Sequence, residues 1–422
     1  MIHRRNAIAG LAGALAAVSW PGGGRARALE PMPESLFMQL GLEGRYAPML
    51  RHLRLRADVA EDPERFMAMQ YWSLMGDEVR AGRPSWRGDP EMLDGAEALD
   101  ALETIAEMAV DRRIVILNEA HDVSGHRAFA GAVARRLRGM GFDWYAAETF
   151  DRSIRDFGPG RPFIARHGFY SLDPAFAETV REAVESGYRL ASYEIIPEQT
   201  HLPRDASGRD HIEEREEVQA LNLIANVLNA DSQARVFVHC GYSHAAETPL
   251  NGTLWFAGRL KDKTGIDPLT INQCQSWPGP EADGDTPITT ALIERIRDGR
   301  PIVLRRADGT FVHSADHHEG AMDLTVAHPR YAQMEGRPGW LANDSSRRRL
   351  AVSLPRAAPE DALIQAVLSS EGEGAVPSDH YPLEPGQETA VLYLRPGEYI
   401  LRIETPEGYT PLGEARVPLL SP

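Results

Sequence analysis

The fold of this 422-residue chain is decided by the stretch RIVILNEAHD, residues 113–122. Its first half, 113–117, is a continuous and largely β-branched apolar run, which is typical of a parallel strand buried on both faces. The run ends abruptly in polar residues that include Glu119 and His121. Ligands bind at the carboxyl ends of the strands in open α/β sheets. The stretch therefore predicts a parallel strand whose end carries a polar site.

The same pattern repeats along the chain to about residue 275. Short apolar runs predict further strands at 144–147, 188–193, 235–239 and 268–272. Amphipathic segments predict helices between them at 126–139, 174–186, 211–228 and 253–264. This alternation indicates parallel strands joined by crossover helices. The predicted fold class is α/β, with a mostly parallel sheet flanked by helices.

The regions on either side of this core differ from it. Upstream, residues 37–53, 63–75 and 90–110 carry apolar side chains at helical spacing. We therefore assign 29–345 to one α/β domain with a helical N-terminal extension. From 346 to 422 the chain becomes short strands separated by Gly and Pro turns, which predicts a small C-terminal β-sandwich module.

The N-terminus has the pattern of a signal peptide. A basic start is followed by an apolar run at 7–20 that is too short to span a membrane, and then by Ala26-Arg27-Ala28. We predict cleavage after residue 28 and a periplasmic or secreted protein. The Arg4-Arg5 pair favours twin-arginine export, with an ordinary secretory signal as the alternative. No later apolar run is long enough to predict a transmembrane segment.

The charge and the cysteines limit the possible partners. The formal net charge of −16 would become −20 once the four arginines of the leader are removed. Such a surface repels phosphate backbones, so nucleic acid is not an expected partner. Cys240 and Cys274 are the two cysteines, and their spacing leaves open a disulfide or two buried thiols.

Four predicted strands end in ionisable residues, which are Glu119 with His121, Glu148, Glu194, and His239 with His244. The carboxyl ends of parallel strands share one edge of the sheet, so these side chains are expected to converge. Such a set suits two kinds of chemistry. It can hold a divalent metal ion through N and O ligands. It can also work without metal, with a carboxylate or imidazole as general base toward water.

The run 116–150 and the motif Gly241-Tyr242-Ser243-His244 resemble the ChaN-like branch of the TIKI/TraB/ChaN/erythromycin-esterase superfamily. In that branch the first strand ends in Gly-Glu-x-His-Asp, the next ends in Glu, and Gly-x-x-His follows a later strand. The segment 215–222 resembles the Arg-containing helix of the erythromycin-esterase branch. The resemblance covers roughly residues 100–275, about 40% of the chain.

The resemblance implies a site made of paired Glu and His residues and one Arg, which are Glu119, His121, Glu148, His244 and Arg215. It also implies a mostly parallel sheet between helices, and activities that include metal-dependent peptide cleavage, macrolide ester hydrolysis and haem binding. One position departs from the motif. Asn118 stands where the first motif has Gly, which would narrow the cavity or add a polar group.

Several of these residues have a second interpretation. Arg215 can stabilise an oxyanion or clamp an anionic group, or it can form a surface ion pair on its acidic helix. Glu194 can face solvent, and His239, inside an apolar strand, is favoured as a satisfied core histidine. Asp122 and His126 can orient the site residues, or Asp122 can cap the following helix.

Two further motifs have a possible functional interpretation. The segment 241–245 approximates a Gly-x-Ser-x-Gly nucleophile elbow, in which Ser243 would need His313 or His317 as its base. That interpretation leaves the strand-end acids without a role. The His/Asp-rich segment 313–318 can bind a metal, but a flexible polar loop is the favoured interpretation.

The sequence thus predicts an exported hydrolase that cleaves an ester, amide or related bond in a small-molecule or peptide substrate. A divalent metal held by Glu119, His121, Glu148 and His244 would activate water, with Arg215 assisting. The first alternative is a haem- or iron-binding uptake protein, in which Glu194, His239 and Tyr242 line the cofactor site. The second is an envelope scaffold that binds through its β module.

Overall fold

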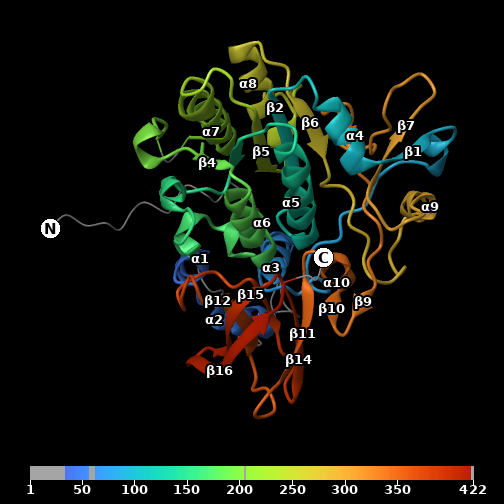
Figure 1. Ribbon diagram of the computed structural model, residues 1–422. Helices are drawn as coiled ribbons and strands as arrows, with labels where there is room; N and C mark the ends of the chain where they lie inside the picture. The colour runs from blue at the N-terminus through green and yellow to red at the C-terminus, as the bar shows by residue number, and fades with distance from the viewer. Residues whose placement is uncertain (1–33, 57–61, 204–205, 420–422) are drawn as a thin grey trace, which may run out of the picture.

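The computed structural model describes residues 34–56, 62–203 and 206–419 (Figure 1). The predicted signal peptide lies outside these residues. The α/β prediction is confirmed, because six parallel strands form one sheet in the order β4-β3-β5-β2-β6-β8. Their bounds are β2 Ile114–Glu119, β3 Trp144–Ala147, β4 Arg189–Ser192, β5 Val236–Gly241, β6 Leu269–Asn272 and β8 Leu324–Thr325. The predicted C-terminal β module is also present.

Helices cover both faces of the parallel sheet. On one face lie α4 (Ala101–Met108), α5 (Ser124–Arg138) and α6 (Pro174–Glu185). On the other lie α7 (Gly208–Leu223), which continues as a π-helical turn, and α8 (Phe256–Thr264). Alternate residues of β2 pack into the two layers, since Val115 and Leu117 face α5 while Ile114 and Ile116 face α8. Burial on both sides explains the unbroken apolar run.

The sheet register brings three chain segments to one edge. In the parallel ladder Glu119 of β2 is paired with Gly241 of β5, and Ala147 of β3 with His239 of β5. The residues that follow β2, β3 and β5 therefore leave the sheet side by side.

The predicted helix over 90–110 is wrong. That segment forms a short 3₁₀ helix (Pro90–Leu93), strand β1 (Glu97–Asp100) and α4, and β1 pairs antiparallel with β7 (Ile302–Arg305). Gly95 turns the chain at φ 68°, and the Asp100 carboxylate caps α4 by accepting a hydrogen bond from Glu103 N at 3.0 Å. The predicted helix over 37–53 is likewise two helices, α1 (Glu34–Leu42) and α2 (Ala47–Arg56), which are separated at Gly44 with φ 68°.

The C-terminal module is an antiparallel β-sandwich. Strands β13-β12-β15-β16 form one sheet and β11-β14 the other, and a single apolar cluster lies between them. Their bounds are β11 Arg348–Ser353, β12 Leu363–Leu368, β13 Asp379–Pro382, β14 Thr389–Leu394, β15 Gly397–Thr405 and β16 Gly408–Val417. The remaining elements are α3 Asp62–Leu74, α9 Pro287–Arg295, β9 Gln333–Met334, β10 Arg337–Pro338 and α10 Gly339–Asn343. None of the helices within the described residues is long and apolar enough to cross a membrane.

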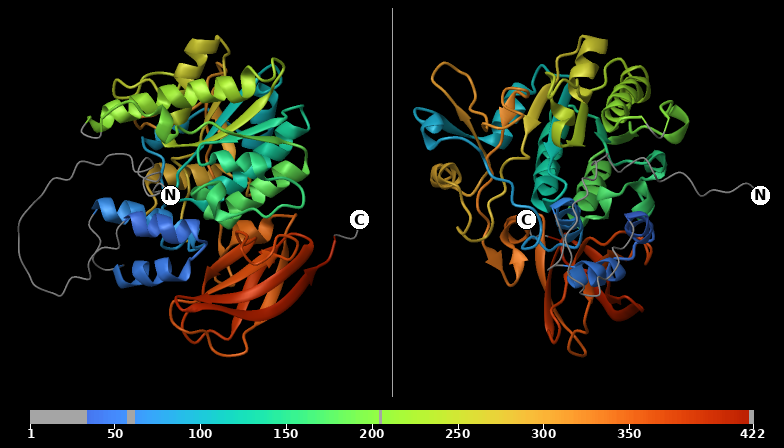
Figure 2. Two further views of the ribbon diagram at one scale, coloured as in Figure 1. Left: turned by 90° about the vertical axis from the view of Figure 1, so that its left-hand side faces the viewer. Right: turned by 180° about the vertical axis from the view of Figure 1, so that it is seen from behind.

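The module packs against the α/β core and the N-terminal helices (Figure 2, left). A buried arginine of α6 makes the central polar contact. Arg181 donates two hydrogen bonds to Glu371, at 2.8 and 2.7 Å, one to Glu178 at 2.8 Å and one to the carbonyl of Val376 at 2.7 Å. Its side chain is 2% exposed. Docking of the module therefore depends on a buried charge network.

Replacing Arg181 with Met is expected to lower the free energy of unfolding by about 3–5 kcal/mol, because a buried ion pair is broken from one side. Denaturant titration followed by circular dichroism measures this effect. The matched control is Arg135→Met, which removes an exposed pair between α5 and Glu182 of α6 and should cost at most about 1 kcal/mol. Equal losses in the two variants would contradict the role of the buried network.

Candidate functional site

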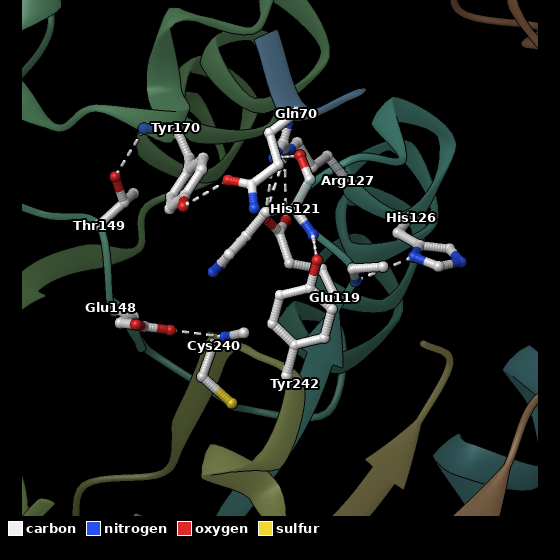
Figure 3. Close-up of polar contacts among 12 residues, drawn as sticks. Gln70, Glu119, His121, His126, Arg127, Glu148, Thr149, Tyr170, Cys240 and Tyr242 are labelled. Atoms are coloured by element: carbon white, nitrogen blue, oxygen red, sulfur yellow. Dashed lines mark hydrogen bonds and ion pairs between the residues drawn. The ribbon is translucent and has the colours of Figure 1, made fainter. Parts of the chain in front are cut away.

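Glu119, His121 and Glu148 lie together at the carboxyl edge of the parallel sheet (Figure 3), and contacts connect Glu194, His239 and His244 to them. Glu119 ends β2 and Glu148 directly follows β3, while Tyr242 and His244 lie in the 3₁₀ turn after β5. Arg215 reaches them from α7. Glu119, His121, Glu148 and His244 are each at most 9% exposed. The site divides into two linked clusters, each built on a carboxylate and an arginine.

The first cluster is centred on Glu119 and Arg127 of α5. Arg127 Nε donates to both carboxylate oxygens of Glu119, at 3.2 and 3.1 Å, and Nη2 donates to Oε1 at 3.0 Å. Its Nη1 donates to Asp173 at 2.6 Å. Burial alone would raise the pKa of Glu119, but Arg127 and the nearby histidines hold it well below its usual value. Glu119 is therefore an ionised, acceptor-only group.

His121 is oriented by this carboxylate. Its Nδ1 lies 2.9 Å from Glu119 Oε1, and its ring stacks on Tyr170 with centroids 3.8 Å apart and planes 14° apart. Because ionised Glu119 can only accept, Nδ1 carries the hydrogen, and neutral His121 has its lone pair on Nε2. Figure 3 shows the ring reaching from Glu119 toward the space between Tyr170 and Glu148.

Gly241 lets the edge of the His121 ring that carries Nε2 pack directly against the end of β5. A Cβ atom at Gly241 would lie 2.4 Å from His121 Nε2 and 3.1 Å from Glu148 Oε2. The absent side chain thus marks a point that the free imidazole nitrogen and the second carboxylate both face. Close approach of backbone to a reacting group is a common reason for glycine at a strand end.

His239 is the core histidine that its apolar strand predicts. It is 2% exposed, hydrogen bonded through Nδ1 to the Tyr145 hydroxyl at 3.1 Å, and stacked on Phe176. It also touches the site, because its Nε2 lies 3.0 Å from Glu119 Oε2.

The second cluster is centred on Glu148 and Arg215. Glu148 Oε2 accepts a hydrogen bond from the backbone N–H of Gly241 at 2.6 Å, and Oε1 accepts from Arg215 Nη2 at 2.6 Å. Arg215 also donates through Nε to Glu194 at 3.0 Å, and its Nη2 contacts the same carboxylate. Both partners are more than 20 positions away in sequence. The surface-pair interpretation of Arg215 is therefore wrong, and Glu194 belongs to the site.

His244 lies between two carboxylates. Its Nε2 is 3.2 Å from Glu148 Oε1, and its Nδ1 is 2.8 Å from Glu216 Oε1. Burial alone would lower the pKa of His244, but Glu148 and Glu216 outweigh it and raise the pKa to about 10. The pKa of Glu148 is held well below its usual value by His244 and Arg215, against the effect of burial. The two carboxylates thus favour the protonated form of His244, against Arg215 Nη1, which lies 3.2 Å from the same Nε2.

These contacts do not suit a metal ion bound by Glu119, His121, Glu148 and His244. Arg127 and Arg215 already occupy the carboxylate lone pairs and supply the positive charge that a cation would bring. Both nitrogens of His244 face carboxylates, which leaves neither free as a ligand. The predicted four-residue metal site therefore has no support in the geometry, and no chemical step is assigned to a metal there.

The turn after β5 is held under strain beside the site. Tyr242 has φ 36°, an unfavourable value for a bulky residue. Its hydroxyl accepts a hydrogen bond from His121 N at 3.1 Å and lies 3.4 Å from Asp122 Oδ1, and its carbonyl accepts from Asn118 Nδ2 at 2.7 Å. Asn118 is completely buried and fixes this turn, so it does not enter the cavity. Strain of this kind clusters at functional sites.

Asp122 and His126 have structural contacts. The first residue before α5 is Val123, and no side-chain cap forms there, so the capping interpretation of Asp122 is wrong. Instead the Asp122 carbonyl accepts from Gly82 N at 3.0 Å. His126 Nδ1 accepts from Ala120 N at 3.2 Å, and burial lowers the pKa of His126 to about 3, which keeps the ring neutral.

Ser243 contacts a histidine that the sequence interpretation did not choose. Its hydroxyl lies 3.0 Å from Nε2 of His318, while His313 pairs with Thr325 at 3.0 Å. Ser243 is 8% exposed. Asp316, His317 and His318 form a group whose ligand atoms all lie within 4.8 Å of one another, which is compatible with a metal ion. Cys240 and Cys274 are both buried free thiols.

The sequence interpretation missed three charged partners of the site residues, which are Arg127, Asp173 and Glu216. A signal for Arg127 exists in the sequence. Side chains in the first turn of a helix point back toward its N-terminus, so an arginine there can reach the strand end that precedes the helix. Asp173 is the N-cap of α6, and an Asp in front of Pro174 marks that helix start in the sequence but does not reveal the contact with Arg127.

No protein-family model matches the chain, and no curated protein does. The solved structures that match include that of the type III effector HopBA1, which is 14% identical over 59% of this chain and 96% of that chain, with a TM-score of 0.30. Another is RRSP, a MARTX toxin effector domain from Vibrio vulnificus CMCP6, at 13% identity over 53% of this chain and 54% of that one, with a TM-score of 0.28. The site is therefore interpreted from its own geometry.

Replacing Arg127 with Met is expected to lower the free energy of unfolding by about 3–5 kcal/mol, because Glu119 and Asp173 are left as buried, uncompensated charges. The control is Arg136→Met on the same helix, whose exposed pair with Glu103 should contribute at most about 1 kcal/mol. Denaturant titration compares the two. A loss in Arg127→Met no larger than the control's would show that Glu119 is not ionised.

The contacts of His244 with Glu148 and Glu216 should make the free energy of unfolding fall as the pH rises. Its pKa is about 10 in the folded chain against 6.5 for an unperturbed histidine, so its contribution is complete below about pH 6.5 and is lost toward pH 10. The slope between these values is about 1.4 kcal/mol per pH unit. His244→Gln should remove this slope when unfolding is measured from pH 6 to 9. An unchanged slope in the variant would mean that His244 is neutral in the fold.

Proposed function

We propose that the protein is an exported hydrolase that cleaves an ester or amide bond without a metal at its Glu/His site. The observation that carries the proposal is the contact of His121 Nδ1 with the buried, arginine-paired carboxylate of Glu119. It leaves Nε2 as the nitrogen without a hydrogen, at the ring edge that lies against Gly241 and near Glu148. The general-base alternative that the sequence also offered thus fits the geometry better than the metal alternative.

His121 is the general base in this scheme. Nε2 takes a proton from a water molecule whose oxygen attacks the carbonyl carbon, and Glu119 stabilises the resulting imidazolium through Nδ1–H. The same proton then passes to the leaving oxygen or nitrogen as the carbon–heteroatom bond breaks. Stacking on Tyr170 fixes the ring plane, which lowers the cost of orienting the base.

Positive charge for the developing oxyanion is available in the second cluster. Arg215 and protonated His244 lie beside Glu148, and the Arg215 side chain is 22% exposed, so it can meet a bound substrate. Donors that are positioned before the reaction stabilise such an oxyanion at no reorganisation cost. Glu194 and Glu148 hold the guanidinium in place from two sides.

The resemblance to the TIKI/TraB/ChaN/erythromycin-esterase superfamily agrees with this proposal, since ester hydrolysis is among the activities it implies. The proposal of export rests on the N-terminal sequence pattern. The proposal of a small-molecule or peptide substrate rests on the buried polar site. Haem capture and an envelope scaffold stay as untested predictions. For haem, the Tyr242 hydroxyl is already engaged with His121 N.

His121→Ala and Glu119→Gln should each lower kcat/KM for chromogenic esters by at least about 100-fold, because the base or its orienting group is lost. Dialysis of the wild-type protein against a chelator should leave kcat/KM at 25 °C within about threefold, since no step uses a metal. His201→Ala, at an exposed histidine elsewhere, is the control. Hydrolysis that survives in His121→Ala, or that stops on chelation, would refute the proposed mechanism.

A further inference from the structure

A second cluster of possible ligands lies in the loop between β7 and β8, apart from the Glu119 and Glu148 clusters. It consists of Asp316, His317 and His318, whose ligand atoms lie within 4.8 Å of one another. The side chains of Asp316 and His318 are 4% and 1% exposed, whereas His317 is at the surface. The loop is therefore packed onto the protein, with one imidazole accessible from solvent.

One carboxylate oxygen in this cluster has no partner. Asp316 Oδ1 accepts a hydrogen bond from His318 N at 2.6 Å and lies 3.3 Å from His318 Nδ1. Asp316 Oδ2 is buried and forms no hydrogen bond within the described residues. A buried carboxylate oxygen without a donor is costly, and a cation is a common means of satisfying it.

His318 is already oriented as metal ligands usually are. Its Nε2 lies 3.0 Å from the Ser243 hydroxyl, so Nδ1 is the nitrogen that faces Asp316. A ligating histidine typically uses its other ring nitrogen in such a hydrogen bond, which fixes the tautomer and the ring plane. The His317 ring lies beside it, with centroids 3.8 Å apart.

We propose that Asp316, His317 and His318 bind a divalent transition-metal ion, with zinc as the best match. Two imidazoles and one carboxylate form a common zinc ligand set, and water would complete a tetrahedron. Calcium and magnesium prefer sites made of oxygen atoms, which the two histidines exclude. No arginine or lysine forms an ion pair with Asp316 in the described part of the chain, in contrast to Glu119 and Glu148.

The proposed ion has a structural role. Through the His318–Ser243 contact it would fix the loop against the 3₁₀ turn Tyr242–Ala245, which carries His244. Binding should therefore raise the thermal stability of the whole chain, because the ion binds the folded state only. It is separate from the proposed hydrolytic step.

Zinc chloride titrated calorimetrically into untagged, chelator-treated protein should show one tight site. Asp316→Asn and His317→Ala should weaken its Kd by about tenfold or more, as loss of a ligand does. His201→Ala, which removes an exposed histidine elsewhere, should bind as wild type does. Because His317 is exposed, its variant is not expected to unfold, and no substrate is involved in the measurement.

Thermal unfolding supplies the second measurement. Saturating zinc should raise Tm by about 3 °C or more in the wild type and in His201→Ala, and by less in Asp316→Asn and His317→Ala. Equal Kd and equal Tm shifts in all four proteins would overturn the site. Absence of zinc binding to the wild-type protein would also overturn it.

Discussion

The buried ion pair between Glu119 and Arg127 is the constraint on which the rest of the site depends. A carboxylate at the end of a central parallel strand is enclosed by helices on both faces, and burial of an unpaired charge would cost several kcal/mol. Arg127, in the first turn of α5, offsets that cost by pairing with Glu119, and it also pairs with the buried carboxylate of Asp173. With Glu119 ionised, His121 has a fixed tautomer and a fixed ring orientation. The charge of Arg127 thus fixes, through Glu119, which nitrogen of His121 carries the hydrogen.

The geometry of parallel strands determines which parts of the site could be predicted from the sequence. Residues at the ends of β2, β3 and β5 must share one edge, so the convergence of Glu119, Glu148 and His244 follows once the strands are recognised. Arg127 and Glu216 lie on helices, where which residues face the site depends on how each helix packs on the sheet. Asp173 caps α6, a place that the Asp-Pro pair marks, but its contact with Arg127 depends on the packing of α5 beside α6. The helix expected over 90–110 fails for a related reason, because β1 exists only through pairing with β7, some 200 residues away.

The same distinction explains the change from a metal to an acid–base interpretation. Glutamates and histidines at strand ends have the composition of a metal site, and composition is what a sequence displays. Whether their lone pairs are free depends on neighbours that are distant in the chain. Here two arginines occupy them, which converts a ligand set into a set of ion pairs. In the loop 316–318 the ligands are local and carry no arginine, so there the composition and the contacts agree.

His121 contacts one carboxylate and His244 contacts two, and this difference gives the two histidines different properties. His121 meets an acid only at Nδ1, which leaves Nε2 able to accept a proton. His244 meets an acid at each nitrogen, so it retains both protons and remains a cation. The two histidines lie on either side of Glu148, with His121 near its Oε2 side at Gly241 and His244 Nε2 3.2 Å from its Oε1. If His244 had a single carboxylate partner, burial would favour its neutral form, and the site would contain two bases and only Arg215 to stabilise an oxyanion. The second carboxylate partner of His244, Glu216, is therefore what separates the two roles.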